Sequence, residues 1–296
     1  MTAARGRKAT MTAARGRAAR QGRAKGARGQ AVLRDVLCGV DGTRTAYEAV
    51  RQAASLAGKG GRLTLLAVVI PSGAARDRAA AVTRAKRTLD HARRLAEERG
   101  VRAEVLVDER RQVAKVLLER AGEHGLLALG APAMSRHAHL LIGGVATQAA
   151  HLLPASLLVG RRPPAKAAFG ERIIVANDAL ESSDALLSFA IRLARLRKAT
   201  LVMLHAAGAE SRFHPTRIAR QSEDLGRALG ERSRTYVVPG RAKNVIVETA
   251  AREDASLVVI GSRRVGGVRA LGSVSERVVH EAPCSVLVVR PEDYRG

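Results

Sequence analysis

The sequence predicts an α/β protein made of two tandem domains, each an open, doubly wound sheet of five parallel strands flanked by helices. First, the strand-like segment LLALG at 126–130 recurs as LVVIG at 257–261, which indicates a duplicated module. Second, short apolar runs alternate with stretches that have apolar residues at helical spacing, as in β-α-β units. Third, aromatic residues make up only 2% of the chain, so Leu, Val, Ile and Ala must fill the core, which suits a buried parallel sheet.

The first domain is predicted at 31–162. Its first strand ends on Asp41, and Thr43 or Thr45 is placed to cap the helix that follows, which closes at Gly58. A long helix with one apolar stripe ends before Gly100, a good C-terminal stop. The predicted strands are about 33–40, 63–70, 101–107, 126–130 and 155–160, and the later helices are 79–98, 111–123 and one from Gly143.

The second domain, predicted at 170–296, repeats that order after a short linker at 163–169 that contains Pro163 and Pro164. So short and proline-stiffened a connection favours a fixed arrangement of the two halves. The predicted strands are 172–177, 200–206, 233–238, 257–261 and 284–290, and the helices are 182–197, 215–229, 241–253 and one from Gly272. The last strand of each half is short and apolar, and we predict that 156–159 and 285–289 pair with each other to form an internal pseudo-dimer. The sequence does not decide whether two copies of the whole chain also form a homodimer.

The formal net charge is +24, and residues 1–30 contribute nine Lys and Arg with no acidic residue. This Gly/Ala/Arg segment cannot bury enough apolar area to fold alone, so a disordered tail is expected. It is interpreted as a non-specific attachment to nucleic acid, anionic membrane or acidic partners, as a solvated extension, or as an organelle transit peptide. No apolar run approaches the ~18 residues of a membrane span, and a cytoplasmic location is the expectation.

Ligand binding is expected beyond the carboxyl ends of the strands, where the strand order reverses. Asp41 and Gly130 end strands of the first half, and Asp178 and Gly261 end the equivalent strands of the second. A carboxylate there can accept hydrogen bonds from a ribose hydroxyl or an adenine amine. A helix opened by glycine offers N–H groups and a positive dipole end to phosphate. The alternative interpretation is that Asp41 only caps the next helix and the glycines only form turns.

Other binding motifs are disfavoured. The glycine-rich segment 58–61 follows a helix and precedes a strand, the reverse of a phosphate loop, and no Walker A or G-x-G-x-x-G motif follows a first strand. No Cys/His cluster has zinc spacing, so no metal site is predicted. His205 at a strand end is interpreted as a hydrogen-bonded structural histidine, and Cys38 and Cys284 as small buried apolar residues.

Taken together, these segments resemble the universal stress protein family in a tandem form that covers nearly all of 33–291. The matching stretches are Val36–Thr43, Arg62–Val69, Leu257–Arg263 and Leu271–Arg290, of which the last is the most specific. The resemblance implies Rossmann-like, adenine-nucleotide alpha hydrolase-like domains, dimerisation through fifth-strand edges and a stress-linked regulatory role. Some members bind ATP through Gly-x2-Gly-x9-Gly-(Ser/Thr) after strand four, together with the aspartate that closes strand one.

The two halves depart from that pattern in opposite ways. The first keeps the spacing of Gly130 and Gly143 but has Ala133 for the second glycine and Gly144 for the hydroxyl residue. The second keeps Gly272 and Ser273, but has Arg264 for the second glycine and a loop two residues shorter. The nucleotide-binding residues implied by the resemblance are Asp41, Gly42, Val69, Gly130, Gly143, Gly144, Asp178, Gly261, Arg263, Gly272, Ser273 and Val274.

Two functions follow from these patterns. The first is a stress-response module that binds ATP or another adenine nucleotide in at least one half, with at most one half binding it well. The alternative is a nucleotide-independent scaffold whose degraded phosphate loops form partner surfaces and whose basic tail contacts nucleic acid or acidic partners. An enzyme is not expected, because Asp41 and Asp178 would face the nucleoside and no other general base lies near the phosphates. Slow ATP hydrolysis ranks third.

Overall fold

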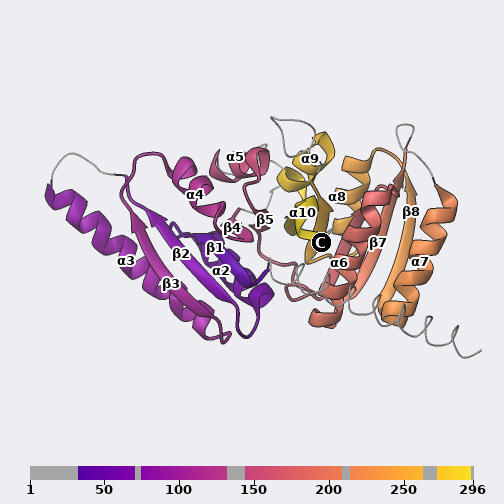
Figure 1. Cartoon of the computed structure of the whole chain (residues 1–296), viewed down its shortest axis with the longest axis horizontal. Coiled ribbons are helices and arrows are strands. Elements are labelled where there is room, and N and C mark those ends of the chain that lie inside the picture. Colours follow the sequence, from indigo (N-terminus) through magenta and orange to yellow (C-terminus); the bar gives the residue numbers. More distant parts are fainter. Residues whose placement is uncertain (1–32, 71–74, 132–143, 209–213, 263–271, 295–296) are drawn as a thin grey trace, which may run out of the picture.

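A single ten-stranded sheet runs through both halves of the chain in the computed structural model, which describes residues 33–70, 75–131, 144–208, 214–262 and 272–294 (Figure 1). The strand order is β3-β2-β1-β4-β5-β10-β9-β6-β7-β8, so each half has the same internal order. The strands are β1 (Asp35–Gly39), β2 (Arg62–Val68), β3 (Arg102–Asp108), β4 (Leu126–Gly130), β5 (Ser156–Gly160), β6 (Arg172–Asn177), β7 (Thr200–Ala207), β8 (Ser233–Pro239), β9 (Leu257–Gly261) and β10 (Ser285–Val289). Within each half all neighbouring strands are parallel, as predicted.

Helices cover both faces of this sheet and divide its core into two layers. One apolar cluster lies under α2 (Arg44–Ala57), α3 (Ala75–Glu97), α6 (Glu181–Arg197) and α7 (Pro215–Leu229). The other lies under α4 (Val113–Ala121), α5 (Gly144–Leu152), α8 (Ala242–Arg252) and α9 (Ser273–Glu281). Alternate residues of each strand face opposite layers, which is why the central strands are apolar throughout.

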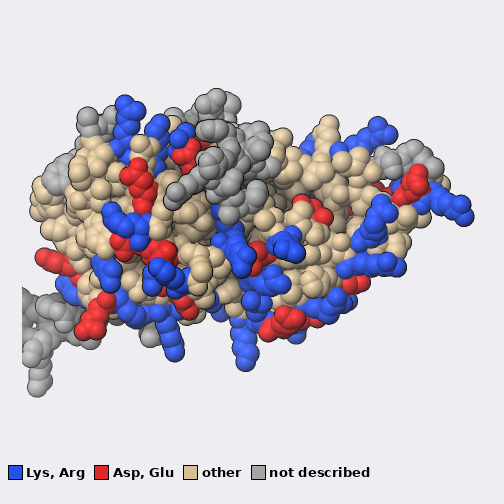
Figure 2. Space-filling model, turned by 180° about the vertical axis from the view of Figure 1, so that it is seen from behind, with Lys and Arg blue, Asp and Glu red and all other residues tan. Residues whose placement is uncertain are grey.

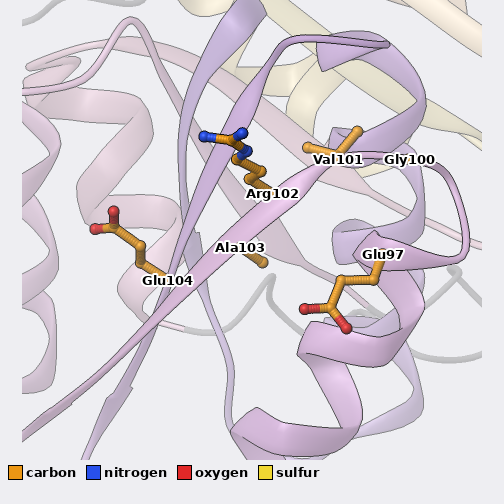
Figure 3. A pocket seen from close by; sticks show the side chains of 6 residues that line it. All are labelled: Glu97, Gly100, Val101, Arg102, Ala103 and Glu104. Carbon is orange, nitrogen blue, oxygen red and sulfur yellow. The ribbon is translucent and has the colours of Figure 1, made fainter.

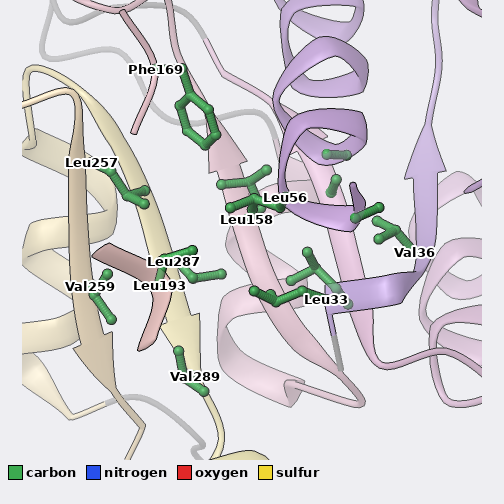
Figure 4. Packing of buried hydrophobic residues seen from close by; sticks show 14 of the residues in the cluster. Leu33, Val36, Leu56, Leu158, Phe169, Leu193, Leu257, Val259, Leu287 and Val289 are labelled. Atoms are coloured by element: carbon green, nitrogen blue, oxygen red, sulfur yellow. The ribbon is translucent and has the colours of Figure 1, made fainter. Parts of the chain in front are cut away.

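Both apolar clusters continue across the boundary between the halves. Leu158 of β5, Leu287 of β10 and Phe169 of the connection all belong to one cluster with Leu56 of α2 and Leu193 of α6 (Figure 4). Each is less than a tenth exposed, and burial of such a side chain contributes about 1.5–3 kcal/mol. The two halves therefore share their cores across the boundary between them.

The halves are joined by antiparallel pairing of their fifth strands, β5 and β10, which we call the seam. Val159 faces Val286 and Leu158 faces Leu287. The predicted pairing of these two strands is confirmed, and it protects two apolar edges that would otherwise be open. Because the seam is antiparallel while each half is parallel, the carboxyl ends of the strands lie on opposite edges of the sheet in the two halves. The two candidate ligand sites are therefore separate.

The helices that follow the predicted strands begin and end close to the expected residues, with two differences. α3 begins at Ala75, about one turn earlier than predicted. A short helix that was not expected from the sequence, α10 (Pro291–Tyr294), follows β10. Proline at its first position and two acidic residues in its first turn are typical of a helix start.

Candidate functional site

The candidate sites lie where the strand order reverses, between β1 and β4 in the first half and between β6 and β9 in the second. Cys38 pairs with Ala128, so two residues further along Val40 and Gly130 stand at the same level, with Asp41 just beyond. Val175 pairs with Val259, which places Asp178 just beyond the level of Gly261 in the same way. The predicted aspartate and glycine of each half are thus brought together.

In the first half, Asp41 organises the turn that leads into α2. Its Oδ1 accepts hydrogen bonds from the backbone N–H of Thr43 at 2.9 Å and from the Thr43 hydroxyl at 2.7 Å. Thr43 is the residue that caps α2, because its Oγ1 accepts from the N–H of Ala46 at 3.2 Å. Gly42 has a φ of +86°, which favours glycine. Asp41 is exposed, so its carboxylate is open to solvent while it supports the cap.

Gly130 is constrained by the start of α2. A Cβ on this residue would lie 2.3 Å from the carbonyl carbon of Thr45 and 2.4 Å from the nitrogen of Ala46. Glycine is therefore required there for packing alone. Gly144, which begins α5, has open space where a Cβ would lie. Val69 is buried just after β2, and its N–H donates a hydrogen bond to the carbonyl of Asp108 at 2.7 Å.

In the second half, the turn after β6 is held differently. Asp178 is partly buried, and its Oδ1 accepts a hydrogen bond from the N–H of Leu180 at 3.1 Å. Ala179, the counterpart of Gly42, is fully buried and has a φ of +55°. A side chain in this left-handed region costs about 1–2 kcal/mol. The turn is kept in place by Asn177, whose Oδ1 accepts from the N–H of Ala179 at 2.7 Å.

A buried polar network supports Asn177. Its Nδ2 donates to Oε1 of Gln221 on α7 at 2.7 Å, and Nε2 of Gln221 donates to the hydroxyl of Ser183 at 3.2 Å. His205 Nδ1 lies 3.0 Å from the Asn177 carbonyl oxygen, in agreement with its interpretation as a structural histidine. The first half has Val40 where the second has Asn177, so it lacks this network. The turn after β6 is therefore held in place by the side-chain amides of Asn177 and Gln221, which both form hydrogen bonds.

The phosphate end of the second half is formed by the start of α9. Gly272 occupies the N-cap position with φ −78° and ψ 166°, and no side chain caps the helix there. The hydroxyl of Ser275 donates to the carbonyl of Gly261 at 3.3 Å and ties the first turn of α9 to the end of β9. Ser273 is exposed. In the first half the residue equivalent to Ser275 is Ala146, which is buried and has no hydroxyl.

Three residues that shape the second candidate site, Ser275, Asn177 and Gln221, were not predicted from the sequence. Ser275 could have been found by comparison with Ala146 in the first copy. No sequence motif indicated a role for Asn177 or Gln221, because the hydrogen bond between them joins segments that are far apart in the chain. Val274 is partly buried in the first turn of α9. The predicted residues Gly143 and Arg263 lie outside the described residues.

No group of three His, Cys, Asp or Glu side chains that could hold a metal ion occurs within the described ranges. No helix in this part of the chain is long and apolar enough to cross a membrane. A shallow pocket lies at the start of the edge strand β3, between Glu97 of α3 and Glu104 (Figure 3). It is at the amino ends of the strands, away from the switch point, and therefore is not part of the candidate sites.

Comparison with known proteins adds independent information. The model of the universal stress protein family matches residues 33–161 and 170–290. A universal stress protein of Mycobacterium tuberculosis is 27% identical over 273 residues, which are 89% of this chain and 98% of that protein. The crystal structure of a universal stress protein from Archaeoglobus fulgidus has a TM-score of 0.70 at 19% identity and covers 86% of this chain and 98% of that one. Another from Archaeoglobus fulgidus, solved in complex with dAMP, has a TM-score of 0.31 at 25% identity over 41% of this chain and 99% of that one.

Proposed function

Because this chain belongs to the universal stress protein family and contains two family domains in tandem, we propose that it is a regulatory module whose second half binds an adenine nucleotide such as ATP. The nucleotide lies across the carboxyl edge of that half, with its nucleoside near Asp178 and its phosphates at the start of α9. One observation carries this choice: the Ser275–Gly261 hydrogen bond holds an uncapped helix start beside the end of β9. The proposal includes no catalytic step.

The phosphate end supplies donors for an anion. A helix leaves the N–H groups of its first turn without partners inside the helix, and its dipole favours negative charge there. Gly272 brings no side chain that would cap them, and the exposed hydroxyl of Ser273 adds a further donor. A hydrogen bond to a charged group contributes about 1.5–3 kcal/mol, which is about ten- to 150-fold in affinity.

The nucleoside end is built around Asp178. Its carboxylate stands at the central strand of the half, between β7 and β9. A ribose hydroxyl or an adenine amine can donate to it. The end of β7 carries the small residues Ala206 and Ala207, which are both partly exposed.

The first half is the weaker site in this proposal. Its helix α5 begins with Gly144 in place of Ser273 and has Ala146 in place of Ser275. Both hydroxyls that organise or bind phosphate in the second half are thus absent. Asp41 remains available to a nucleoside, but a nucleoside held without phosphate contacts binds less tightly.

Isothermal titration of the full chain with ATP tests the proposal through matched variants. Ser273→Ala and Asp178→Asn are each expected to weaken binding about tenfold or more, since each removes a hydrogen bond to the nucleotide. Asp41→Asn is the control in the first half and is expected to leave the affinity unchanged. Absence of binding, or loss of binding in Asp41→Asn alone, contradicts the assignment to the second half.

A further inference from the structure

The two helical faces of the sheet differ in charge. Helices α2, α3, α6 and α7 together carry fifteen Lys and Arg and eight Asp and Glu. Helices α4, α5, α8 and α9 carry five basic and four acidic residues. We call the first group the basic face. Figure 2 shows many Lys and Arg side chains along the lower part of the molecule, with fewer Asp and Glu between them.

The excess of charge is greatest on α3. Arg76, Arg84, Arg87 and Arg94 are all exposed, and none of them forms an ion pair with a carboxylate within the described residues. At 3.6 residues per turn these four arginines lie on the side of the helix away from the buried Leu89 and form one stripe. From the first to the last the stripe spans about 27 Å at ~1.5 Å per residue.

Neighbouring arginines on α3 are neutralised and do not belong to this stripe. Arg78 pairs with Glu109, and Arg93 pairs with Asp90 at 3.1 Å. Two of the three carboxylates of α3, Asp90 and Glu97, are thus engaged by Arg93, and the four stripe arginines keep their full charge toward solvent. Such a row of guanidinium groups, each able to bind phosphate through two parallel N–H groups, matches a polyanion with regularly spaced phosphates.

We propose that the basic face binds the phosphate backbone of duplex nucleic acid without reading its sequence, and that the α3 stripe is the centre of contact. A duplex presents about one phosphate per 1.7 Å of its axis, so the stripe can meet several phosphates at once. The chain has no Trp, and the aromatic side chains beside the stripe, His91 and Tyr47, are partly buried and packed against each other, so no open aromatic face is offered to unpaired bases. A single-stranded partner is therefore disfavoured.

An anionic membrane fits the basic face less well. A helix that lies in a membrane interface inserts large apolar side chains beside its basic ones. Of the large apolar residues that are exposed within the described ranges, only Leu196 belongs to the helices of the basic face. None of these exposed large apolar residues belongs to α3. Phosphates of a duplex are thus the better match for this surface.

Fluorescence anisotropy with a short labelled DNA duplex and the full chain tests the proposal. The variant Arg84→Ala/Arg87→Ala/Arg94→Ala is expected to bind about tenfold more weakly at low salt, and the slope of log K against log salt is expected to fall by about 2–3. The matched control, Lys115→Ala/Arg120→Ala/Lys243→Ala on the opposite helical face, removes the same charge and is expected to keep both values.

The control also accounts for residues 1–30, which are present in every variant. Equal affinities for the two triple variants would show that the basic face is not the binding surface, as would an absence of DNA binding by the full chain. A co-sedimentation arm with phosphatidylserine vesicles identifies the partner class: binding to vesicles but not to duplex DNA overturns the proposal. Circular dichroism confirms that both variants are folded before they are compared.

Discussion

The backbone N–H of Arg161 donates a 3.0 Å hydrogen bond to Oγ of Ser285 across the seam. The repeat places Arg290 and Ser156 at the equivalent positions, and the N–H of Arg290 donates to Oγ of Ser156 at 3.1 Å. The same pair of residue types thus closes both ends of the antiparallel strand pair. The seam is an internal two-fold relationship that is specified by hydrogen bonds as well as by apolar packing.

The two guanidinium groups of this pair have different surroundings. Arg290 forms an ion pair with Asp293 of α10 at 2.8 Å. Arg161 is fully buried and has no carboxylate partner within the described chain; its Nη2 donates to the carbonyl of Val279 at 2.6 Å. Burial lowers the pKa of Arg161 to about 10. One half of the seam therefore contains a buried cation that main-chain carbonyls stabilise.

Removal of this buried side chain is expected to destabilise the whole fold. Arg161→Ala leaves a cavity and unpaired buried carbonyls, and it should lower the free energy of unfolding by about 3 kcal/mol or more. The neighbouring Arg162→Ala is the matched control, because Arg162 is exposed and its loss should change stability by less than about 0.5 kcal/mol. Urea unfolding followed by circular dichroism measures both. Equal midpoints for the two variants would show that the seam does not depend on Arg161.

The two glycines of the first candidate site should respond oppositely to a methyl group. Gly130→Ala forces a Cβ into the backbone of α2 and should lower the free energy of unfolding by about 3 kcal/mol or more, whereas Gly144→Ala has open space and should change it by less than about 1 kcal/mol. Thermal melting compares the two. A Gly130→Ala variant as stable as the parent chain would contradict the close approach of β4 and α2.

His280, in the last turn of α9, should make stability dependent on pH. Burial lowers its pKa below the ordinary value of 6.5, and Arg161 and His151 act in the same direction while Glu276 and Glu281 oppose it. The unfolded chain then binds the proton more readily, so stability falls as pH drops through about 6.5 toward the lower folded pKa.

The substitution His280→Gln removes this proton-linked loss. The parent chain should therefore lose more stability than the variant between about pH 7.5 and 5 in urea titrations. His214→Gln is the control, because His214 is exposed before α7. If His280→Gln and the parent chain show the same pH dependence, the histidine does not titrate with folding.

Neither cysteine should react while the protein is folded. Cys38 and Cys284 are buried and free, and burial raises the pKa of both thiols, that of Cys284 to about 12. The reactive species is the thiolate, so a thiol-specific colorimetric reagent near pH 8 should detect no thiol in the native chain and both after denaturation. Rapid native labelling at one position would indicate that its strand opens.

The sequence predicted the parts of the fold that depend on local pattern. Apolar periodicity and the duplicated strand at 126–130 and 257–261 identified the parallel strands, and the exposed apolar edges of the fifth strands predicted the seam. Partners distant in sequence could not be predicted. Arg161 belongs to the predicted first domain, and no pattern in the sequence indicates that it is buried against α9. Gly130 has a packing role that no motif reveals, because the constraint comes from α2.

The candidate site was predicted less completely than the fold. Residue types at strand ends can be read from the sequence, so the positions of Asp178, Gly261, Gly272 and Ser273 at one edge of the second half could be predicted. The sequence also predicts that the two halves differ as nucleotide sites. The Ser275 hydrogen bond and the network beneath Asn177 are further differences, which only the folded chain brings together. Position along the chain gives the location of a strand-end site, and tertiary contacts determine how rigidly it is held.

The number of adenine nucleotides bound per chain distinguishes a single site in the second half from two equivalent sites. Equilibrium dialysis of the full chain against radiolabelled ATP measures that number without a change of sequence. We expect one nucleotide per chain at saturation, since only the second half combines Asp178 with the tethered, uncapped start of α9. Two equivalent sites per chain, or none, would contradict the assignment of nucleotide binding to the second half.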